Sequence, residues 1–391
     1  MYSLYNNCSY SSSSFLNVLS SLQYFSKPIS KFIADFFESI IIAESINFDK
    51  IATILMNKLN IKFDSITRKI SRFISNSKSN FISLFNNVVK LVLSNYKIKH
   101  KDCRIHISLD HMFVKSKFSI LMFSLRIGKQ GIPIFFEVFP GKEKEGSNKA
   151  FSFNTLSSSI KYVHNLIKSY IPNADIIFLA DRWFGSHFRL MNFIDSLGAG
   201  YVFRTKGMFK TFYNHPKEGH KIWTFLEELP NYVYHSSFFE NIEITNNKFV
   251  CNLAICKSDK HKERWYLLTN KDPKRAKKDY AYRFGAIETI FKNEKSNGFY
   301  IEKTGIKNIH SFENMYSLVC IAQIYLTCLG TDVSKNSNCY KNIGFRTSKK
   351  DKNGALRRCV SLFKTGLRLF KLVVIGRMKL RLPFSFILYD I

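Results

Sequence analysis

Three acidic residues have types and positions that could serve one chemical step. Asp110 ends the apolar run 105–109, Asp181 ends the apolar run 176–180, and Glu288 lies in a segment with helical periodicity. Carboxylates that converge from separate elements are the oxygen ligands that hard cations such as Mg²⁺ prefer. Two such cations activate an attacking oxygen and stabilise a leaving one. The three residues therefore predict a metal-dependent phosphoryl-transfer site.

The segment around Glu288 also carries positive charge. Lys292 and Lys295 follow Glu288 by four and seven residues, so on a helix they share its face and could follow a phosphate backbone. Each residue has a plainer interpretation. An aspartate at a strand end often caps a turn, and Glu288 with Lys292 is a common surface pair. Only the combination of order, context and spacing favours a site.

The elements that must position these residues begin near residue 103. Three short β-rich runs predict an antiparallel meander, and strands that alternate with helices follow it. This order predicts a mixed α/β core of the ribonuclease H type, with the sheet flanked by helices. The expected strands are 105–110, 118–127, 132–139, 176–180 and 201–204, and the expected helices are 154–170, 186–197 and 312–329.

Residues 1–100 have helical patterns separated by polar breaks. Asp64 is a candidate cap for a helix that carries Arg68, Lys69 and Arg72 beside apolar residues. A helix, a short break and a basic helix predict a helical DNA-binding region that resembles a helix-turn-helix unit. A solvated charged face on an ordinary helical bundle explains the same pattern equally well.

The rest of the chain divides by pattern into a catalytic domain at 101–334 and a basic C-terminal tail at 335–391. Within the catalytic domain, helical periodicity weakens at 211–268, and short strands predict a β-rich insertion there, including one at 232–235. In the tail, residues 355–370 have a helical pattern.

Composition narrows the partners of the chain. Its 391 residues include 59 Lys and Arg against 29 Asp and Glu, a formal net charge of +30, which predicts a polyanionic partner such as nucleic acid. Biased codon usage would explain part of the lysine excess. The eight cysteines form no Cys-x-x-Cys pair, the N-terminus lacks the pattern of a secretory signal, and the most apolar stretch, 315–330, is short for a membrane span. We therefore expect a cytoplasmic, nucleoid-associated protein without a membrane partner.

Residues 105–330 resemble the catalytic domain of insertion-sequence DDE transposases that carry the Tyr-Arg-Glu-Lys signature. Asp110, the segment Asp181-Arg182-Trp183-Phe184-Gly185, and Glu288 with Lys295 seven residues later match the motifs of that family. The run Tyr201-Val-Phe-Arg204-Thr-Lys206 is similar to the strand that precedes the β insertion in that family.

One spacing departs from the family pattern. Four residues separate Arg283 from Glu288, where the family has three. On an ideal helix, five positions correspond to about 140°, so the two side chains would lie on different faces. A one-residue π-bulge near Gly285 would restore their alignment, and we predict one there.

The resemblance implies a DNA transposase that recognises terminal inverted repeats, frees a 3′-hydroxyl and joins it to target DNA as a homodimer on DNA. It implies that Asp110, Asp181 and Glu288 hold two Mg²⁺ ions, for which Mn²⁺ substitutes. The residues expected to contact DNA are Tyr280, Arg283, Lys292, Lys295, Arg204 and Lys206. A non-catalytic or decayed DNA-binding descendant, and a nuclease on the same core, are the alternatives. Trp183 and Trp265 are expected to pack in the core rather than stack on a base.

Overall fold

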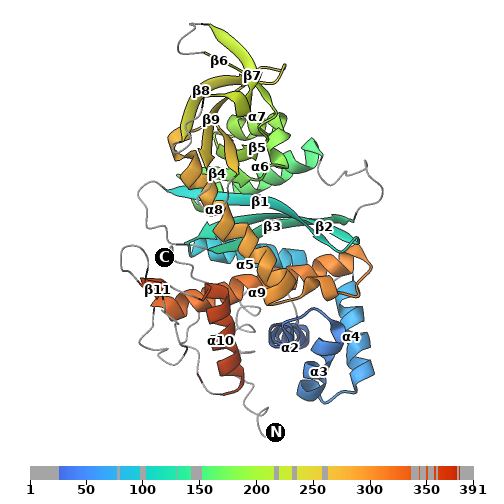
Figure 1. The fold of residues 1–391 in the computed structure, drawn as a ribbon. Helices are drawn as coiled ribbons and strands as arrows, with labels where there is room; N and C mark the ends of the chain where they lie inside the picture. The colour runs from blue at the N-terminus through green and yellow to red at the C-terminus, as the bar shows by residue number, and fades with distance from the viewer. Residues whose placement is uncertain are drawn as a thin grey trace.

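The computed structural model describes a mixed α/β protein with a ten-stranded sheet and a helical N-terminal region (Figure 1). The described residues are 26–76, 80–96, 103–128, 130–141, 152–214, 220–230, 236–257, 263–335, 343, 349–350, 356–357, 360–376 and 378. The predicted strand at 232–235 lies outside them.

The sheet has the strand order β3-β2-β1-β4-β5-β10-β9-β8-β6-β7. β1, β2 and β3 pair antiparallel, β1, β4 and β5 pair parallel, and the strands beyond β5 pair antiparallel. The predicted antiparallel meander is thus confirmed. The strands are β1 Arg104–Val114, β2 Phe118–Ile127, β3 Gln130–Pro140, β4 Asp175–Ala180, β5 Gly200–Thr205, β6 Lys210–Asn214, β7 Lys221–Phe225, β8 Ser237–Ile244, β9 Phe249–Lys257 and β10 Arg264–Thr269.

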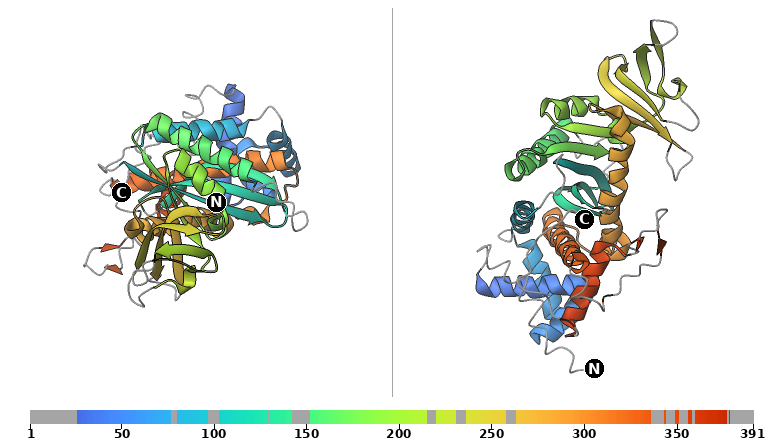
Figure 2. Two further views of the ribbon diagram at one scale, coloured as in Figure 1. Left: turned by 90° about the horizontal axis from the view of Figure 1, so that it is seen from above. Right: turned by 90° about the vertical axis from the view of Figure 1, so that its left-hand side faces the viewer.

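Helices cover both faces of the central strands, which explains why β2 and β4 are buried along almost their whole length. α6 (Phe153–Tyr170) and α7 (Phe188–Ser196) lie on one face, and α8 (Pro273–Lys292) crosses the other face (Figure 2). In the order of the sheet, α8 contacts every strand from β3 to β8, so one helix spans the meander and the parallel strands. Its C-terminal half carries Glu288.

Four N-terminal helices pack below the sheet: α2 Lys27–Ala43, α3 Phe48–Leu59, α4 Phe63–Ser75 and α5 Phe81–Ser94. In α4, Ile66, Ile70 and Ile74 recur every four residues and are buried, so this stripe faces the other helices. α4 begins at Phe63 and has no side-chain cap. The prediction that Asp64 caps this helix was wrong, because Asp64 lies inside its first turn.

α9 (Ile309–Lys335) is the central helix of the lower half. It contacts α2, α4 and α5 from the N-terminal region, β3 of the sheet, and α10 (Leu362–Val374) from the C-terminal region. α9 is long and apolar enough to cross a membrane, but 89% of its most apolar 18-residue stretch is buried inside the protein. That burial is what a core helix requires. Two further strands, β11 Lys349–Lys350 and β12 Leu356–Arg357, form a separate small sheet.

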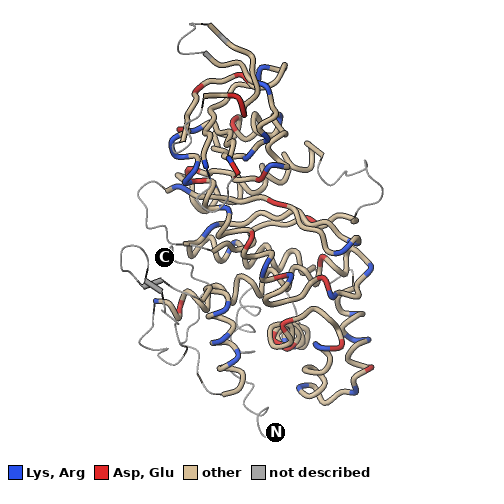
Figure 3. The backbone as a smooth tube through the Cα atoms, in the orientation of Figure 1, with Lys and Arg blue, Asp and Glu red and all other residues tan. Residues whose placement is uncertain are grey.

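Strands β6 to β9 extend the main sheet beyond β10 and project away from α9 (Figure 1). They fall in the segment where the sequence predicts a β-rich insertion, and they continue the same sheet because β10 pairs with both β5 and β9. Lys and Arg are distributed from these distal strands to α4 and α10 (Figure 3).

Candidate functional site

The pairing of β1 with β4 places two of the predicted acidic residues at the same level of the sheet. The pairing runs as far as Ser108 with Leu179, and Asp110 and Asp181 each stand two residues further along the chain. Residues two apart in a strand point to the same face. Asp110 does not end its strand as predicted, because β1 continues to Val114. It is β4 that ends here, and Asp181 is the first residue after it.

Both aspartates accept hydrogen bonds from nearby backbone. Asp110 Oδ1 accepts from the His111 N–H at 2.8 Å, and Asp181 Oδ1 accepts from the Trp183 N–H at 2.9 Å. The turn-capping role that is common for such residues therefore applies to Asp181. One carboxylate oxygen of each residue is engaged in this way.

The turn after Asp181 lies tightly against the end of β5. A Cβ atom on Gly185 would lie 1.9 Å from the carbonyl oxygen of Arg204, so no other residue fits there without a shift of backbone. The Thr205 hydroxyl donates to the Gly185 carbonyl at 3.0 Å. Gly185 thus fixes the turn that carries Asp181 beside the strand that carries Arg204.

Arg283 links Asp110 to the predicted glutamate. Its Nη2 donates to Asp110 Oδ2, and its Nη1 lies 3.4 Å from Glu288 Oε1. The Arg283 side chain is 6% exposed and that of Asp110 13%, whereas Glu288 is 47% exposed. The structure therefore brings Arg283 and Glu288 together despite their five-residue offset.

The predicted π-bulge near Gly285 was wrong. α8 is a continuous α-helix to Lys292, and its π-helical turn, Asn293–Asn297, comes after Glu288. Arg283 reaches Asp110 because it lies on the buried face of α8, and the long Glu288 side chain reaches Arg283 from the neighbouring face. Ile287, one residue earlier, is fully buried.

The charges in this cluster influence one another. Burial and the neighbouring Asp181 raise the pKa of Asp110, while the Arg283 guanidinium opposes that rise. Tyr280 is 1% exposed, and burial raises the pKa of its hydroxyl to about 12. Its ring packs edge to face on Trp265 and Phe284. Tyr280 thus supports α8 from within the core, and its predicted contact with DNA stays a prediction.

Among the residues that the structure describes, no three His, Cys, Asp or Glu side chains lie close enough together to form a metal site. The Arg283 guanidinium, a cation, stands between Asp110 and Glu288. The donor chemistry of the cluster still suits Mg²⁺ or Mn²⁺, because its acidic members are all carboxylates and Asp110 and Asp181 repel each other.

The other predicted DNA contacts lie in two places. Arg204 and Lys206 lie at and just beyond the end of β5. Lys292 is exposed at the end of α8, and Lys295 lies in the π-turn with its Nζ 3.2 Å from Glu302 Oε1. The α-helical spacing that put Lys295 on the face of Glu288 does not hold, because α8 ends at Lys292.

The two tryptophans differ in exposure. Trp265 is buried, as predicted, whereas Trp183 is 37% exposed, so the prediction that it packs in the core was wrong. The Trp183 ring contacts His111 edge to face at 5.1 Å between centroids. It lies beside Asp181 in the chain and presents an aromatic surface there.

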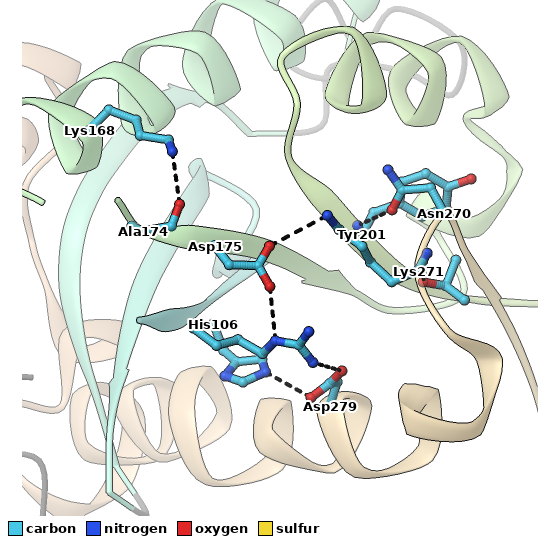
Figure 4. Close-up of polar contacts among 10 residues, drawn as sticks. His106, Lys168, Ala174, Asp175, Tyr201, Asn270, Lys271 and Asp279 are labelled. Carbon is cyan, nitrogen blue, oxygen red and sulfur yellow. Dashed lines mark hydrogen bonds and ion pairs between the residues drawn. The ribbon is translucent and has the colours of Figure 1, made fainter. Parts of the chain in front are cut away.

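A polar network holds the opposite end of α8 on the sheet (Figure 4). His106 of β1 hydrogen-bonds Asp279 of α8 at 3.0 Å, and Arg104 bridges Asp279 and Asp175. Arg104 pairs with Asp175 six residues before the level of Asp110, about 20 Å along the strand. This network fixes the direction of α8 from a distance and is no part of the cluster.

Two neighbours of the site were not among the predicted residues. Arg182 and Glu263 form an ion pair of 2.8 Å, and Glu263 also pairs with Arg204 at 2.7 Å. Arg182 follows Asp181 directly, so its position offered a signal. Glu263 is 82 residues further along the chain than Asp181, and no local pattern marks it.

Comparison with protein-family models and with curated proteins finds no match to this sequence. The proposal of function therefore rests on the residues, their geometry and the resemblance in their motifs.

Proposed function

We propose that this protein is a DNA transposase, which cleaves a phosphodiester bond at a DNA end and joins the freed 3′-hydroxyl to target DNA. The observation that carries the proposal is the register that sets Asp110 level with Asp181 where β4 ends. Ligands bind preferentially beyond the carboxyl ends of such parallel strands. Arg283 and Glu288 approach the same point from α8.

We further propose that the sheet is of the ribonuclease H type. Three antiparallel strands followed by two parallel ones, in the order β3-β2-β1-β4-β5, support that assignment. In it, the strands from β6 to β9 are the insertion, and the segment 101–334 is the catalytic unit.

The proposed cofactor is a pair of Mg²⁺ ions held by Asp110, Asp181 and Glu288. When bound, such ions activate the attacking oxygen and stabilise the leaving oxygen of a phosphodiester. The role of Arg283 is electrostatic: it neutralises Asp110 in the free protein, and its guanidinium suits a DNA phosphate. Lys292, Lys295, Arg204 and Lys206 would add phosphate contacts around the cleaved strand.

The proposed partners are the terminal inverted repeats of a mobile element and a target duplex. Because two ends must be held together for joining, the working form would be a homodimer on DNA. The net charge of +30 supports a polyanionic partner.

Asp181→Asn provides the direct test. Purified protein would be incubated with Mg²⁺, a labelled duplex taken from the DNA that flanks its own coding sequence, and a supercoiled target plasmid. We expect the wild type to cleave and join this duplex. The Asn variant should bind the duplex but not cleave it, because it loses a metal ligand and one negative charge.

Asp49→Asn is the matched control, since Asp49 is exposed in the first turn of α3 and far in the chain from the cluster. It should cleave and join like the wild type. Cleavage without joining by the wild type would indicate a nuclease, and binding without cleavage would indicate a DNA-binding protein. Full cleavage by Asp181→Asn would refute the assignment of Asp181.

A further inference from the structure

A pocket opens beside the acidic cluster, between the end of β5, the start of β10 and the turn after β4. Its walls combine cations with apolar surface, and they include the exposed side chain of Met208. The residues that line it are Arg182, Arg204, Thr205, Lys206, Gly207, Met208, Glu227, Glu263, Arg264 and Tyr266.

One carboxylate bridges two arginines in this pocket. Glu263 Oε1 lies 2.8 Å from Arg182 Nη1, and Glu263 Oε2 lies 2.7 Å from Arg204 Nη2. The Arg204 hydrogen bond is the main cause that lowers the pKa of Glu263, so the carboxylate is ionised. Two guanidiniums converging on a pair of anionic oxygens form the arrangement that also binds a phosphate group.

The two arginines belong to the surroundings of the proposed active site. Arg182 is adjacent in sequence to Asp181, and the close contact at Gly185 holds that turn on the end of β5. Ala180 of β4 pairs with Phe203 of β5, and Asp181 and Arg204 are the next residues after this pair, so Arg204 stands beside Asp181. A strand whose phosphodiester lies at the cluster would thus pass near the pocket.

The bridging carboxylate is held less firmly than the arginine beneath it. The Glu263 side chain is 51% exposed and that of Arg204 is 14% exposed. Ion pairs of such exposed carboxylates are weak and exchange readily with other anions. Met208 and Tyr266 add apolar and aromatic surface on which a sugar or a base can rest beside a bound phosphate.

We propose that this pocket binds a backbone phosphate of the nucleic-acid strand that leaves the acidic cluster, and that Glu263 occupies the phosphate position in the free protein. Entry of the strand replaces the Glu263 carboxylate on Arg182 and Arg204. This inference rests on the proposed function, since it takes nucleic acid to be the ligand. Glu263 then acts as an internal competitor of the phosphate for Arg182 and Arg204.

The first test measures binding of a fluorescein-labelled single-stranded oligonucleotide by anisotropy, without divalent cations. Glu263→Gln removes the competing charge, and we expect affinity to rise roughly five- to tenfold. Glu240→Gln is the matched control, because Glu240 is an exposed glutamate on β8 that does not line the pocket, whereas Glu263 makes the ion pairs with Arg182 and Arg204. It should change affinity less than about twofold, as a single surface charge does.

The second test uses inorganic pyrophosphate and calorimetry, and so needs no DNA. Glu263→Gln should bind pyrophosphate more tightly than Glu240→Gln, and the added change Arg204→Gln should cancel the gain. Equal behaviour of the two Gln variants with both probes would overturn the proposal while leaving DNA binding by the wild type intact. Tighter pyrophosphate binding in a protein that binds no oligonucleotide would refute both the proposed function and the nucleic-acid occupant.

Discussion

Arg283 is the residue that connects the acidic side chains of the candidate site. It is almost fully buried and contacts carboxylates from a strand and from its own helix. In the free protein it supplies the positive charge that Asp110 and Asp181 need, since like charges at close range are costly. A residue of this kind stabilises the fold, and under the proposed function it would compete with a metal cation.

Arg283→Gln should therefore leave the carboxylates of the cluster without the positive charge that pairs with them. We expect a loss of about 3–5 kcal/mol in the free energy of unfolding, because one partner of a buried ion pair is left without the other. Added Mn²⁺ should raise the melting temperature of the variant more than that of the wild type, because the cation replaces the lost charge. Thermal unfolding with and without Mn²⁺ measures both effects.

Arg182→Gln is the control for this experiment, since the Arg182 side chain is 45% exposed and pairs with Glu263 rather than with the aspartates. Its melting temperature should respond to Mn²⁺ like that of the wild type. An equal Mn²⁺ response in the Arg283 variant would argue against a cation site at the aspartates.

At the scale of elements, the π-helical turn at Asn293–Asn297 follows α8 and packs on α9. Two consecutive polar side chains anchor it on α9. Asn293 hydrogen-bonds Gln323 at 3.3 Å, and Tyr316 donates to Glu294 at 2.8 Å. Glu294 is fully buried, and burial raises its pKa to about 8, against opposing effects of Tyr316 and Lys295. Cys320, like Tyr316, is a buried titratable group that is influenced by Glu294.

The raised pKa makes the joint sensitive to alkaline conditions. The folded state holds the Glu294 proton more tightly than the unfolded state does. The protonated Glu294 therefore adds to the free energy of unfolding at low pH, and this contribution is lost as pH rises from about 5 through 8. Glu294→Gln keeps an acceptor for Tyr316 and removes the titration. We expect its free energy of unfolding to fall less over that range than that of the wild type, as measured by urea denaturation at several pH values.

Glu302→Gln serves as the comparison, because Glu302 pairs with Lys295 at 3.2 Å and its side chain is 47% exposed. This variant should keep the pH dependence of the wild type. If Glu294→Gln showed the same slope as well, Glu294 would be ionised in the folded protein over the whole range.

At the scale of the whole molecule, α9 joins regions that are far apart in sequence. Asn314 of α9 donates to the Ile74 carbonyl of α4 at 2.8 Å, and the Ile46 N–H donates to the Phe299 carbonyl at 3.0 Å. Lys371 of α10 pairs with Glu44 at the end of α2. The N-terminal helices are thus packed on the core. Because α9 contacts both α4 and β3, it fixes the position of α4 relative to the sheet.

α4 presents Arg68 and Arg72 in an exposed groove on the side opposite its buried isoleucines. If this groove contacts DNA phosphates, binding of a duplex should weaken with salt by about 0.9 log units per contact for each log unit of salt. Arg68→Gln with Arg72→Gln should then lower that slope by about two. Titration at several salt concentrations provides the slope.

Lys31→Gln with Lys50→Gln removes the same charge from exposed positions on α2 and α3. This pair should leave the slope nearly unchanged. Equal slopes for both double variants would mean that α4 has an ordinary solvated face, the second interpretation of its sequence.

The sequence by itself determined the order of the main strands and helices from β1 to α9. Alternation in 105–109 and the helical spacing at 284–291 come from local burial, so β1 and α8 were predictable. Asp110, Asp181 and Glu288 could be selected because each follows or lies within such an element. The end of β1 and the start of α4 were missed, since pairing with β2 and packing of helices extended both elements beyond their local signals.

Only the tertiary structure decided which side chains meet. The register of β1 with β4 places Asp110 beside Asp181. The path of α8 allows Arg283 to contact Asp110 without the predicted bulge. Glu263 joins Arg182 and Arg204 across 81 and 59 positions of the chain. Such contacts depend on long-range pairing and on the reach of side chains, and neither leaves a periodic trace in a single sequence.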